Sequence, residues 1–238
     1  MKAKAKRGVV LLSGGLDSAT VLYLAREKGY ELVGLIFDYG QRHKKEIEAA
    51  KNLSREAKIG YLVEKIKIPW GGSSLLGKNN RIPHYHKMPL DKVPSTYVPA
   101  RNIIFLSFAL SFAESIKAGA VFIGAHSQDY SGYPDCRMEF LNAFRKVAQL
   151  GTAAGRGEQG IKIEAPLIRM DKAGIIRLGL KLNVPYRLTW SCYQGGRYPC
   201  GRCDSCYYRA KGFKQIGIPD PIGAPNLPIG RVPSRRKI

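Results

Sequence analysis

Residues 8–18 read Gly8-Val9-Val10-Leu11-Leu12-Ser13-Gly14-Gly15-Leu16-Asp17-Ser18, and this stretch decides the fold. Its first five residues are a short, apolar, partly β-branched run, which predicts a buried strand. The Gly-Gly pair predicts a tight turn, and the apolar spacing over residues 19–28 predicts a helix. We therefore expect a strand, a glycine-rich loop and a helix in direct succession.

The same alternation continues along the chain. Apolar runs predict further strands over residues 31–37, 61–68, 120–125 and 161–165. Amphipathic or strongly apolar stretches predict helices over residues 44–58, 102–117, 138–150 and 171–182, the last with Asp171 as its cap. Repeated strand-helix alternation predicts an α/β fold with a doubly wound parallel sheet. Residues 69–99, rich in Pro, Gly and Asn, are long for a simple connection and suggest a flap or substrate loop.

The loop over residues 13–18 has the features of a phosphate site. A strand that turns into a helix presents backbone N–H groups and a positive helix end at the carboxyl edge of a parallel sheet. Glycines let the backbone approach an anion, Ser13 and Ser18 offer hydroxyl donors, and Asp17 can hold Mg²⁺ or cap the helix. The plain alternative is an ordinary strand-to-helix turn capped by Asp17 or Ser18.

A second glycine-rich segment resembles a phosphate-binding motif but does not meet its requirements. Residues 72–79 nearly match the pattern G-x-x-x-x-G-K-[ST], but Asn79 stands where Mg²⁺ binding needs Ser or Thr. The surrounding Pro and Asn residues also leave neither a strand before it nor a helix after it. We therefore assign no phosphate site there.

Four of the five cysteines form one closely spaced set, Cys192, Cys200, Cys203 and Cys206, with glycines between them that permit tight turns. This spacing predicts a tetrahedral Zn²⁺ site, and an iron-sulfur cluster is the alternative. Four thiolates leave no open position on the metal, so we expect one structural zinc. The remaining Cys136 is either a small buried apolar residue or a functional thiol facing a cleft.

Composition narrows the class of protein. The 238 residues, 45% of them hydrophobic, suffice for one large domain or one domain with a small appendage. The net charge of +21 attracts polyanions, but several cations lie at the two ends, so we do not expect direct nucleic-acid binding. The apolar run after the basic first residues is too short for a signal peptide, and no run is long enough to cross a membrane, so we expect a cytoplasmic protein.

The hexapeptide Ser13-Gly14-Gly15-Leu16-Asp17-Ser18 resembles the signature of the PP-loop, or N-type, ATP pyrophosphatases. This resemblance implies an adenine nucleotide alpha-hydrolase-like fold, with ATP bound by residues 12–18 (Leu12, Ser13, Gly14, Gly15, Leu16, Asp17 and Ser18) and Mg²⁺ as a cofactor. It also implies chemistry at the α-phosphate: AMP is transferred to a substrate oxygen, pyrophosphate leaves, and a nucleophile then displaces AMP.

Further segments, spread over most of the chain, resemble one family in that superfamily, the 7-cyano-7-deazaguanine synthases of the queuosine and archaeosine pathways. They are Phe37-Asp38-Tyr39-Gly40-Gln41-Arg42-His43, Val98-Pro99-Ala100-Arg101-Asn102, Asp129-Tyr130-Ser131-Gly132-Tyr133-Pro134-Asp135-Cys136-Arg137, Pro166-Leu167 with Lys172-Ala173, Ser191-Cys192-Tyr193, and the cysteine motif continuing through Arg209-Ala210 and Gly212-Phe213. The resemblance implies a carbon-nitrogen ligase that converts 7-carboxy-7-deazaguanine and ammonia to the nitrile, through an adenylated carboxylate and an adenylated amide. Free ammonium is the expected nitrogen source.

Within this resemblance, six residues become candidate catalytic groups: Asp17, Ser18, Asp38, Arg101, Asp135 and Arg137. Asp38 could bind Mg²⁺ or the ribose, and Arg101 could bind phosphate or the substrate carboxylate, unless the two are a cap or a surface pair. Asp135 suits the guanidine-like edge of a deazaguanine and Arg137 its carboxylate, unless they form a salt bridge in a turn. Tyr39, Gln41, Arg42 and His43 could shape the pocket.

The expected organisation is an ATP-binding and catalytic domain over residues 1–185, a four-cysteine region over residues 186–218, and an extended Pro-rich basic tail over residues 219–238. The sequence leaves a monomer and a homo-oligomer both open. The strongest rival function is a tRNA-modifying enzyme of the same superfamily that adenylates a tRNA base, either a thiolase or a lysidine-type enzyme. Thiolation normally needs a pair of reactive cysteines, and only Cys136 lies outside the metal set.

Overall fold

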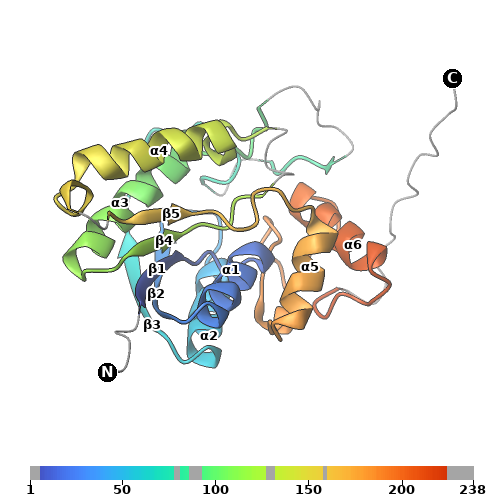
Figure 1. The fold of residues 1–238 in the computed structure, drawn as a ribbon. Helices are drawn as coiled ribbons and strands as arrows, with labels where there is room; N and C mark the ends of the chain where they lie inside the picture. The colour runs from blue at the N-terminus through green and yellow to red at the C-terminus, as the bar shows by residue number, and fades with distance from the viewer. Residues whose placement is uncertain (1–5, 78–80, 86–92, 127–131, 158–159, 224–238) are drawn as a thin grey trace, which may run out of the picture.

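A computed structural model describes residues 6–77, 81–85, 93–126, 132–157 and 160–223 of the chain. Its centre is a five-stranded parallel sheet with helices on both faces, the α/β fold expected from the sequence (Figure 1). The strands are β1 (Lys6–Leu11), β2 (Tyr30–Asp38), β3 (Gly60–Lys65), β4 (Ala120–Phe122) and β5 (Lys162–Glu164). Among the described residues, no helix is both long and apolar enough to cross a membrane.

The sheet has the order β3-β2-β1-β4-β5, and every neighbouring pair is parallel. From β1 the chain builds outward through β2 and β3, and then returns to add β4 and β5 on the other side of β1. The direction of growth therefore reverses between β1 and β4. In open α/β sheets the crevice at such a reversal, beyond the carboxyl ends of the strands, is where ligands bind.

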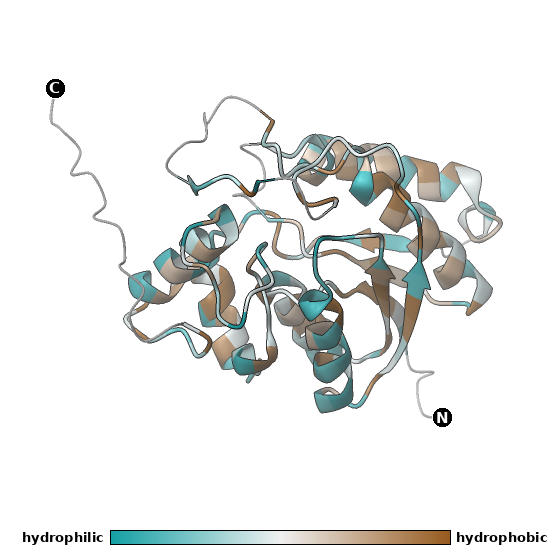
Figure 2. Cartoon of the chain, turned by 180° about the vertical axis from the view of Figure 1, so that it is seen from behind, coloured by the Kyte–Doolittle hydropathy of each residue, from teal (hydrophilic) through white to brown (hydrophobic). Residues whose placement is uncertain are grey.

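Helices cover the two faces of the sheet in separate layers. The helices are α1 (Leu16–Glu27), α2 (Lys45–Glu56), α3 (Arg101–Ser115), α4 (Met138–Gly151), α5 (Lys172–Lys181) and α6 (Asp204–Gln215). Alternate residues of β1 separate the layers, because Val9 and Leu11 pack in the cluster with α3 and α4, whereas Val10 packs in the cluster with α1, α2 and α5. Figure 2 shows the apolar strands enclosed between these layers, with hydrophilic residues on the outer sides of the helices.

Most expected elements are present, with shifted ends. The strands expected over residues 61–68, 120–125 and 161–165 end at Lys65, Phe122 and Glu164, because backbone pairing with the neighbouring strand stops there. The Asp171 cap is confirmed, since its Oδ1 accepts the N–H of Gly174 at 2.8 Å. Helix α1 begins at Leu16, earlier than the expected residue 19, so Asp17 and Ser18 belong to its first turn.

Helix α6 had no sequence prediction of its own, and it packs against α5 at the end of the described chain. Gly212 allows this contact, because a Cβ there would lie 2.7 Å from side-chain atoms of Ile176 and Lys172. Arg209 of α6 is 4% exposed and holds Asp220 with two bonds of 2.7 and 2.9 Å. The tail expected over residues 219–238 lies outside the described residues from residue 224 onward.

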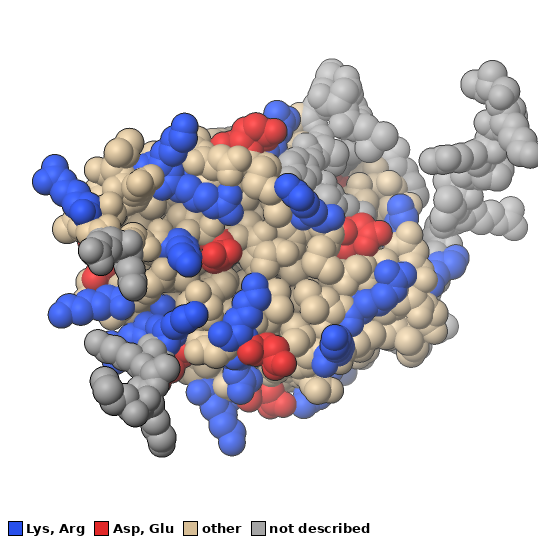
Figure 3. Space-filling model, in the orientation of Figure 1, with Lys and Arg blue, Asp and Glu red and all other residues tan. Residues whose placement is uncertain are grey.

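Lys and Arg are spread over the visible face rather than gathered in one patch, with a few acidic side chains among them (Figure 3). Some charged side chains of the described residues are paired, as in Lys51 with Glu48 at 2.8 Å and Arg187 with Glu56 at 3.5 Å. The positive field on this face is therefore diffuse, which agrees with sequence-independent attraction of anions.

Candidate functional site

A cavity of about 260 Å³ opens beside the carboxyl ends of β1, β2 and β4, where the direction of sheet growth reverses. The loop after β1 forms one wall of it through Ser13, Gly15 and Asp17. Gly124, just after β4, lies so close that a Cβ there would be 3.1 Å from the N of Ser18. The site thus stands where strand order alone places a ligand crevice.

The loop after β1 is shaped for an anion. Gly14 has φ = +82°, a left-handed conformation, and a Cβ on it would lie 2.2 Å from the carbonyl oxygen of Glu46 in α2. The Ser13 and Ser18 hydroxyls lie 3.0 Å apart, at the positive N-terminal end of α1. Two hydroxyls and a helix end therefore lie at the same part of the cavity, which fits the phosphates of a nucleotide.

Asp17 belongs to a buried charge cluster that joins three elements. Lys172, the first residue of α5, donates from Nζ to Asp17 Oδ1 at 2.7 Å and lies 2.9 Å from Nε2 of His126. His126 Nε2 is 3.5 Å from the second carboxylate oxygen of Asp17. Burial alone raises the pKa of Asp17, but the charge of Lys172 and the contact with His126 outweigh it and hold this pKa well below its usual range. Asp17 is thus a fixed negative charge at the cavity floor.

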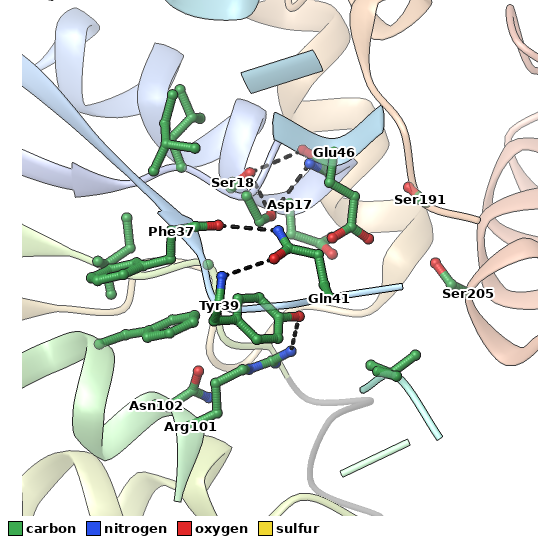
Figure 4. A pocket seen from close by; sticks show the side chains of 18 of the residues that line it. Asp17, Ser18, Phe37, Tyr39, Gln41, Glu46, Arg101, Asn102, Ser191 and Ser205 are labelled. Atoms are coloured by element: carbon green, nitrogen blue, oxygen red, sulfur yellow. Dashed lines mark hydrogen bonds between the residues drawn. The ribbon is translucent and has the colours of Figure 1, made fainter. Parts of the chain in front are cut away.

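Arg101 forms the opposite wall at the start of α3. Its Nη1 donates to the Tyr39 hydroxyl at 3.4 Å, and its guanidinium lies 5.9 Å from the ring centres of Tyr39 and of Phe105 (Figure 4). Burial acts to lower the pKa of Arg101, but the surrounding acceptors, Tyr39 first among them, raise it, so the guanidinium stays charged. The result is one cation held against aromatic rings and facing the cavity.

The Gln41 side chain fixes the turn after β2 that carries Tyr39. It accepts the N–H of Tyr39 at 2.9 Å and donates to the carbonyl oxygen of Phe37 at 3.1 Å (Figure 4). Residues 39, 41, 42 and 43, which the sequence suggested as pocket-shaping, all line the cavity: Tyr39, Gln41, Arg42 and His43.

A third wall comes from the segment before the cysteines. Trp190 donates its backbone N–H to the carbonyl oxygen of Gly14 at 2.9 Å, which ties this segment directly to the loop after β1. Its ring lies under the ammonium group of Lys45, 4.2 Å from the ring centre, and its Nε1 donates to the carbonyl oxygen of Cys192 at 2.9 Å. Ser191, Tyr193 and Ser205 extend the same wall.

The four cysteines predicted as metal ligands come together in the structure. The sulfur atoms of Cys192, Cys200, Cys203 and Cys206 all lie within 4.8 Å of one another. Four backbone N–H groups point at these sulfurs: Gln194 N and Cys200 N at 3.4 and 3.3 Å from Cys192 Sγ, and Cys203 N and Arg202 N at 3.4 and 3.5 Å from Cys200 Sγ. Such donors stabilise thiolates, and four thiolates at this spacing fit a tetrahedral ion with metal-sulfur bonds of about 2.3 Å.

The remaining candidate residues do not line the cavity. Asp38 pairs with Lys44 near the end of β2, and Arg137 is exposed immediately before α4. Asp135 is buried and accepts the backbone N–H of Asn102 on Oδ2 at 3.0 Å. Their roles in binding or catalysis stay predictions, whereas Asp17, Ser18 and Arg101 do face the cavity.

Sequence reasoning gave no role to several residues of the site. Lys172 appeared there only as part of a family motif, and His126 and Glu46 carried no local pattern at all. The available signal was position, because His126 follows the fourth strand and Lys172 begins the fifth helix, both at the sheet edge that carries the glycine-rich loop.

The family of the chain follows from its similarity to known proteins. The sequence model of the family described as queuosine biosynthesis protein QueC matches residues 7–217. The 7-cyano-7-deazaguanine synthase of Acetivibrio thermocellus is 51% identical over 218 residues, covering 91% of this chain and 97% of that protein. The protein of the same name from Thermoplasma volcanium is 49% identical over 218 residues, covering 91% of this chain and 90% of its own.

Among solved structures, NMN synthetase from Francisella tularensis superimposes with a TM-score of 0.50 at 16% identity, covering 90% of this chain and 79% of that one. At this identity the likeness concerns the fold alone. The family match spans the strand-loop-helix unit, the cavity and the cysteine cluster together. The chain therefore belongs to the family of queuosine biosynthesis protein QueC.

Proposed function

We propose that the chain is an ATP-dependent carbon-nitrogen ligase that converts 7-carboxy-7-deazaguanine and ammonia to 7-cyano-7-deazaguanine. Two observations together carry this proposal. The loop after β1 suits an anion, and relatives of about half-identical sequence bear the name 7-cyano-7-deazaguanine synthase. The relatives contribute the substrate class, and the cavity contributes groups suited to ATP and to a second, planar, anionic molecule.

The proposed reaction activates the substrate twice. A carboxylate oxygen attacks the α-phosphorus of ATP and pyrophosphate leaves; ammonia then displaces AMP, which gives the amide and releases a proton. The amide oxygen attacks a second ATP in the same way. Loss of AMP and of the two N–H protons then leaves the nitrile. Each of the two carboxylate oxygens therefore departs on one molecule of AMP, and this balance gives the reaction a measurable signature.

The polar and charged residues of the cavity would bind different parts of the two substrates. Residues 12–18 would hold the phosphates of ATP, with Ser13 and Ser18 as hydroxyl donors. Arg101 would hold the substrate carboxylate or the α-phosphate, because it is a charged fork facing the cavity. Asp17 would offer a carboxylate oxygen to Mg²⁺, which would supply positive charge to neutralise the phosphates. Asp38, Asp135 and Arg137 would act from outside the cavity.

The cysteine cluster would hold one structural Zn²⁺. Residues 186–218 would then form the zinc-binding region, residues 1–185 the ATP-binding and catalytic domain, and residues 219–238 a tail without a catalytic part. The support is the bond from Trp190 to Gly14, through which the segment next to the cysteines reaches the loop after β1. Zinc would thus hold one wall of the cavity in place rather than take part in the chemistry.

The test is mass spectrometry of the products after incubation of zinc-replete protein with ATP, Mg²⁺, ammonium and 7-carboxy-7-deazaguanine labelled with ¹⁸O in the carboxylate. We expect the nitrile, pyrophosphate, and AMP that carries one ¹⁸O per molecule. Arg101→Met should reduce nitrile formation by about 100-fold or more, because the positioned cation is lost. Lys214→Met, a change of an exposed cation in α6, is the matched control and should leave the rate unchanged.

Two results would count against the proposal. ATP turnover without a nitrile would keep the nucleotide site but remove the deazaguanine substrate, and an adenylated tRNA base would then be the next candidate. A nitrile with unlabelled AMP would retain the substrate but exclude both adenylated intermediates.

A further inference from the structure

Glu46 is a carboxylate of the cavity without an assigned task. It lies in the first turn of α2 and is one of two acidic side chains that line the cavity among the described residues, the other being Asp17. Asp17 is already held by Lys172. Glu46 has no hydrogen bond or ion pair with the described part of the chain, and its carboxylate points into the cavity (Figure 4). A partly buried carboxylate without partners is incompletely solvated, and a ligand with N–H donors would stabilise it.

Other groups that could bind a ligand through two parallel bonds are occupied. Both ends of the Gln41 amide are used, on Tyr39 and on Phe37. The carboxylate of Asp135 holds the start of α3, where Oδ2 accepts the N–H of Asn102. Among the described side chains that line the cavity, Glu46 is therefore the carboxylate with both oxygens open to a ligand.

The substrate of the proposed reaction presents two different polar ends. Its six-membered ring carries the guanine edge, N1–H and the 2-amino group, which are two parallel donors. Its carboxylate projects from the five-membered ring at the other side of the bicycle. In the cavity, Glu46 projects from α2, on one face of the sheet, and Arg101 projects from α3, on the other (Figure 4). Glu46 and Arg101 thus line the cavity from opposite faces of the sheet, and the rings of Tyr39 and Phe105 line it as well.

We propose that Glu46 is the specificity residue that binds the guanine edge of the substrate, its two carboxylate oxygens accepting N1–H and the 2-amino group. The inference rests on the proposed function for the identity of the substrate. It explains how a site that must hold two purine-like rings tells them apart. Adenine presents a donor beside an acceptor on the matching edge, so a carboxylate would pair with one atom and repel the other.

The electrostatics of Glu46 agree with this assignment. Burial raises the pKa of Glu46 to about 7, and the charge of Arg101 only partly opposes this effect. The carboxylate is therefore poorly solvated in the cavity, and two N–H donors would stabilise its charged form.

The experiment measures binding of the product, 7-cyano-7-deazaguanine, and of its analogue without the 2-amino group, by titration calorimetry on zinc-replete protein. Wild type should bind the analogue about 10- to 100-fold more weakly, because one charge-assisted hydrogen bond is lost. Glu46→Gln should weaken the guanine ligand by a similar factor and bring the two ligands within about threefold of each other. The Glu46→Gln variant should raise KM for 7-carboxy-7-deazaguanine more than it lowers kcat, while its affinity for ATP stays unchanged.

Glu48→Gln is the matched control, because Glu48 lies on the same helix, is exposed and pairs with Lys51; it should behave as wild type. Asp135→Asn tests the competing assignment. The inference is overturned if Glu46→Gln keeps the wild-type preference for the 2-amino group, or if Asp135→Asn abolishes that preference instead. It is also overturned if Glu46→Gln weakens ATP and both ligands equally, since Glu46 would then be structural. If the wild type binds neither ligand and forms no nitrile, the result contradicts the proposed function itself and not only the role of Glu46.

Discussion

Replacing Gly14 by Ala should damage the protein far more than the same change at its neighbour Gly15. Gly14 has φ = +82°, and an added Cβ would lie 2.2 Å from the carbonyl oxygen of Glu46 and 2.8 Å from the backbone N of Ala50. The left-handed conformation costs Ala about 1–2 kcal/mol. The two close contacts are with the backbone of α2, which cannot rotate away, so forcing them apart adds about 1–3 kcal/mol. Gly14→Ala should therefore destabilise the fold by about 2–5 kcal/mol.

Gly15→Ala is the control because it adds the same methyl group to the next residue. Gly15 has φ = −79° and ψ = 168°, which any residue adopts, and its added Cβ would meet Ser13 Oγ at an ordinary 3.4 Å. Loss of Gly at a helix N-cap costs at most about 1 kcal/mol. In thermal scans, Gly14→Ala should lower Tm by roughly 5–15 °C and Gly15→Ala by no more than about 3 °C.

The same two variants separate stability from ligand binding. Gly14→Ala should also lose affinity for ATP at a temperature where it is still folded, since the shift moves the loop after β1 away from α2. Equal Tm values for the two variants would show that the loop tolerates a side chain at residue 14. That result would refute the argument that α2 forces the loop into its left-handed turn.

Three further changes have expected outcomes. Removing metal with a chelator should lower Tm by more than 5 °C and weaken ATP binding, because the wall next to the cysteines loses its anchor; an unchanged Tm would exclude a structural metal. Asp220→Asn should destabilise the fold by about 2–4 kcal/mol in urea, because it leaves the buried Arg209 charge without its bidentate partner, whereas Asn at an exposed acid should cost little. Asp17→Asn should destabilise the protein by about 1–3 kcal/mol at pH 7, because it removes the carboxylate partner of buried Lys172. Since the folded-state pKa of Asp17 is held low, its contribution is complete above the unfolded value near 4 and disappears as pH falls below it, so the gap between wild type and variant should close on acidification.

Local sequence patterns predicted most of the secondary structure. Alternating apolar runs and amphipathic stretches located the five strands and five of the six α-helices, because periodicity is a local consequence of which face is buried. The ends were less certain, since a strand ends where its neighbour stops pairing, which happens at Lys65 and Phe122. Helix α6 was missed because its cysteine, glycine and two tyrosines do not form a continuous apolar stripe.

Some residues of the candidate site could likewise be predicted from local sequence, and others could not. Ser13, Asp17 and the four cysteines were recognisable because their chemistry depends on close spacing along the chain. Asp38 and Asp135 were candidates through the family resemblance; in the fold, Asp38 pairs with Lys44, and Asp135 accepts a backbone N–H at the start of α3. Which side chain faces a cavity depends on how distant elements pack, and no short motif contains that information.

What the sequence determined by itself was a glycine-rich turn after a buried strand, a parallel α/β sheet, and a set of four thiolates. The tertiary structure decided which groups meet. It brought Lys172 and His126 to Asp17, set Trp190 on the carbonyl of Gly14, and left Glu46 facing Arg101 across the cavity. The physical reason is that turns and metal motifs are fixed by neighbours in sequence, whereas charge pairs between elements are fixed by strand order and helix packing, which only the folded chain specifies.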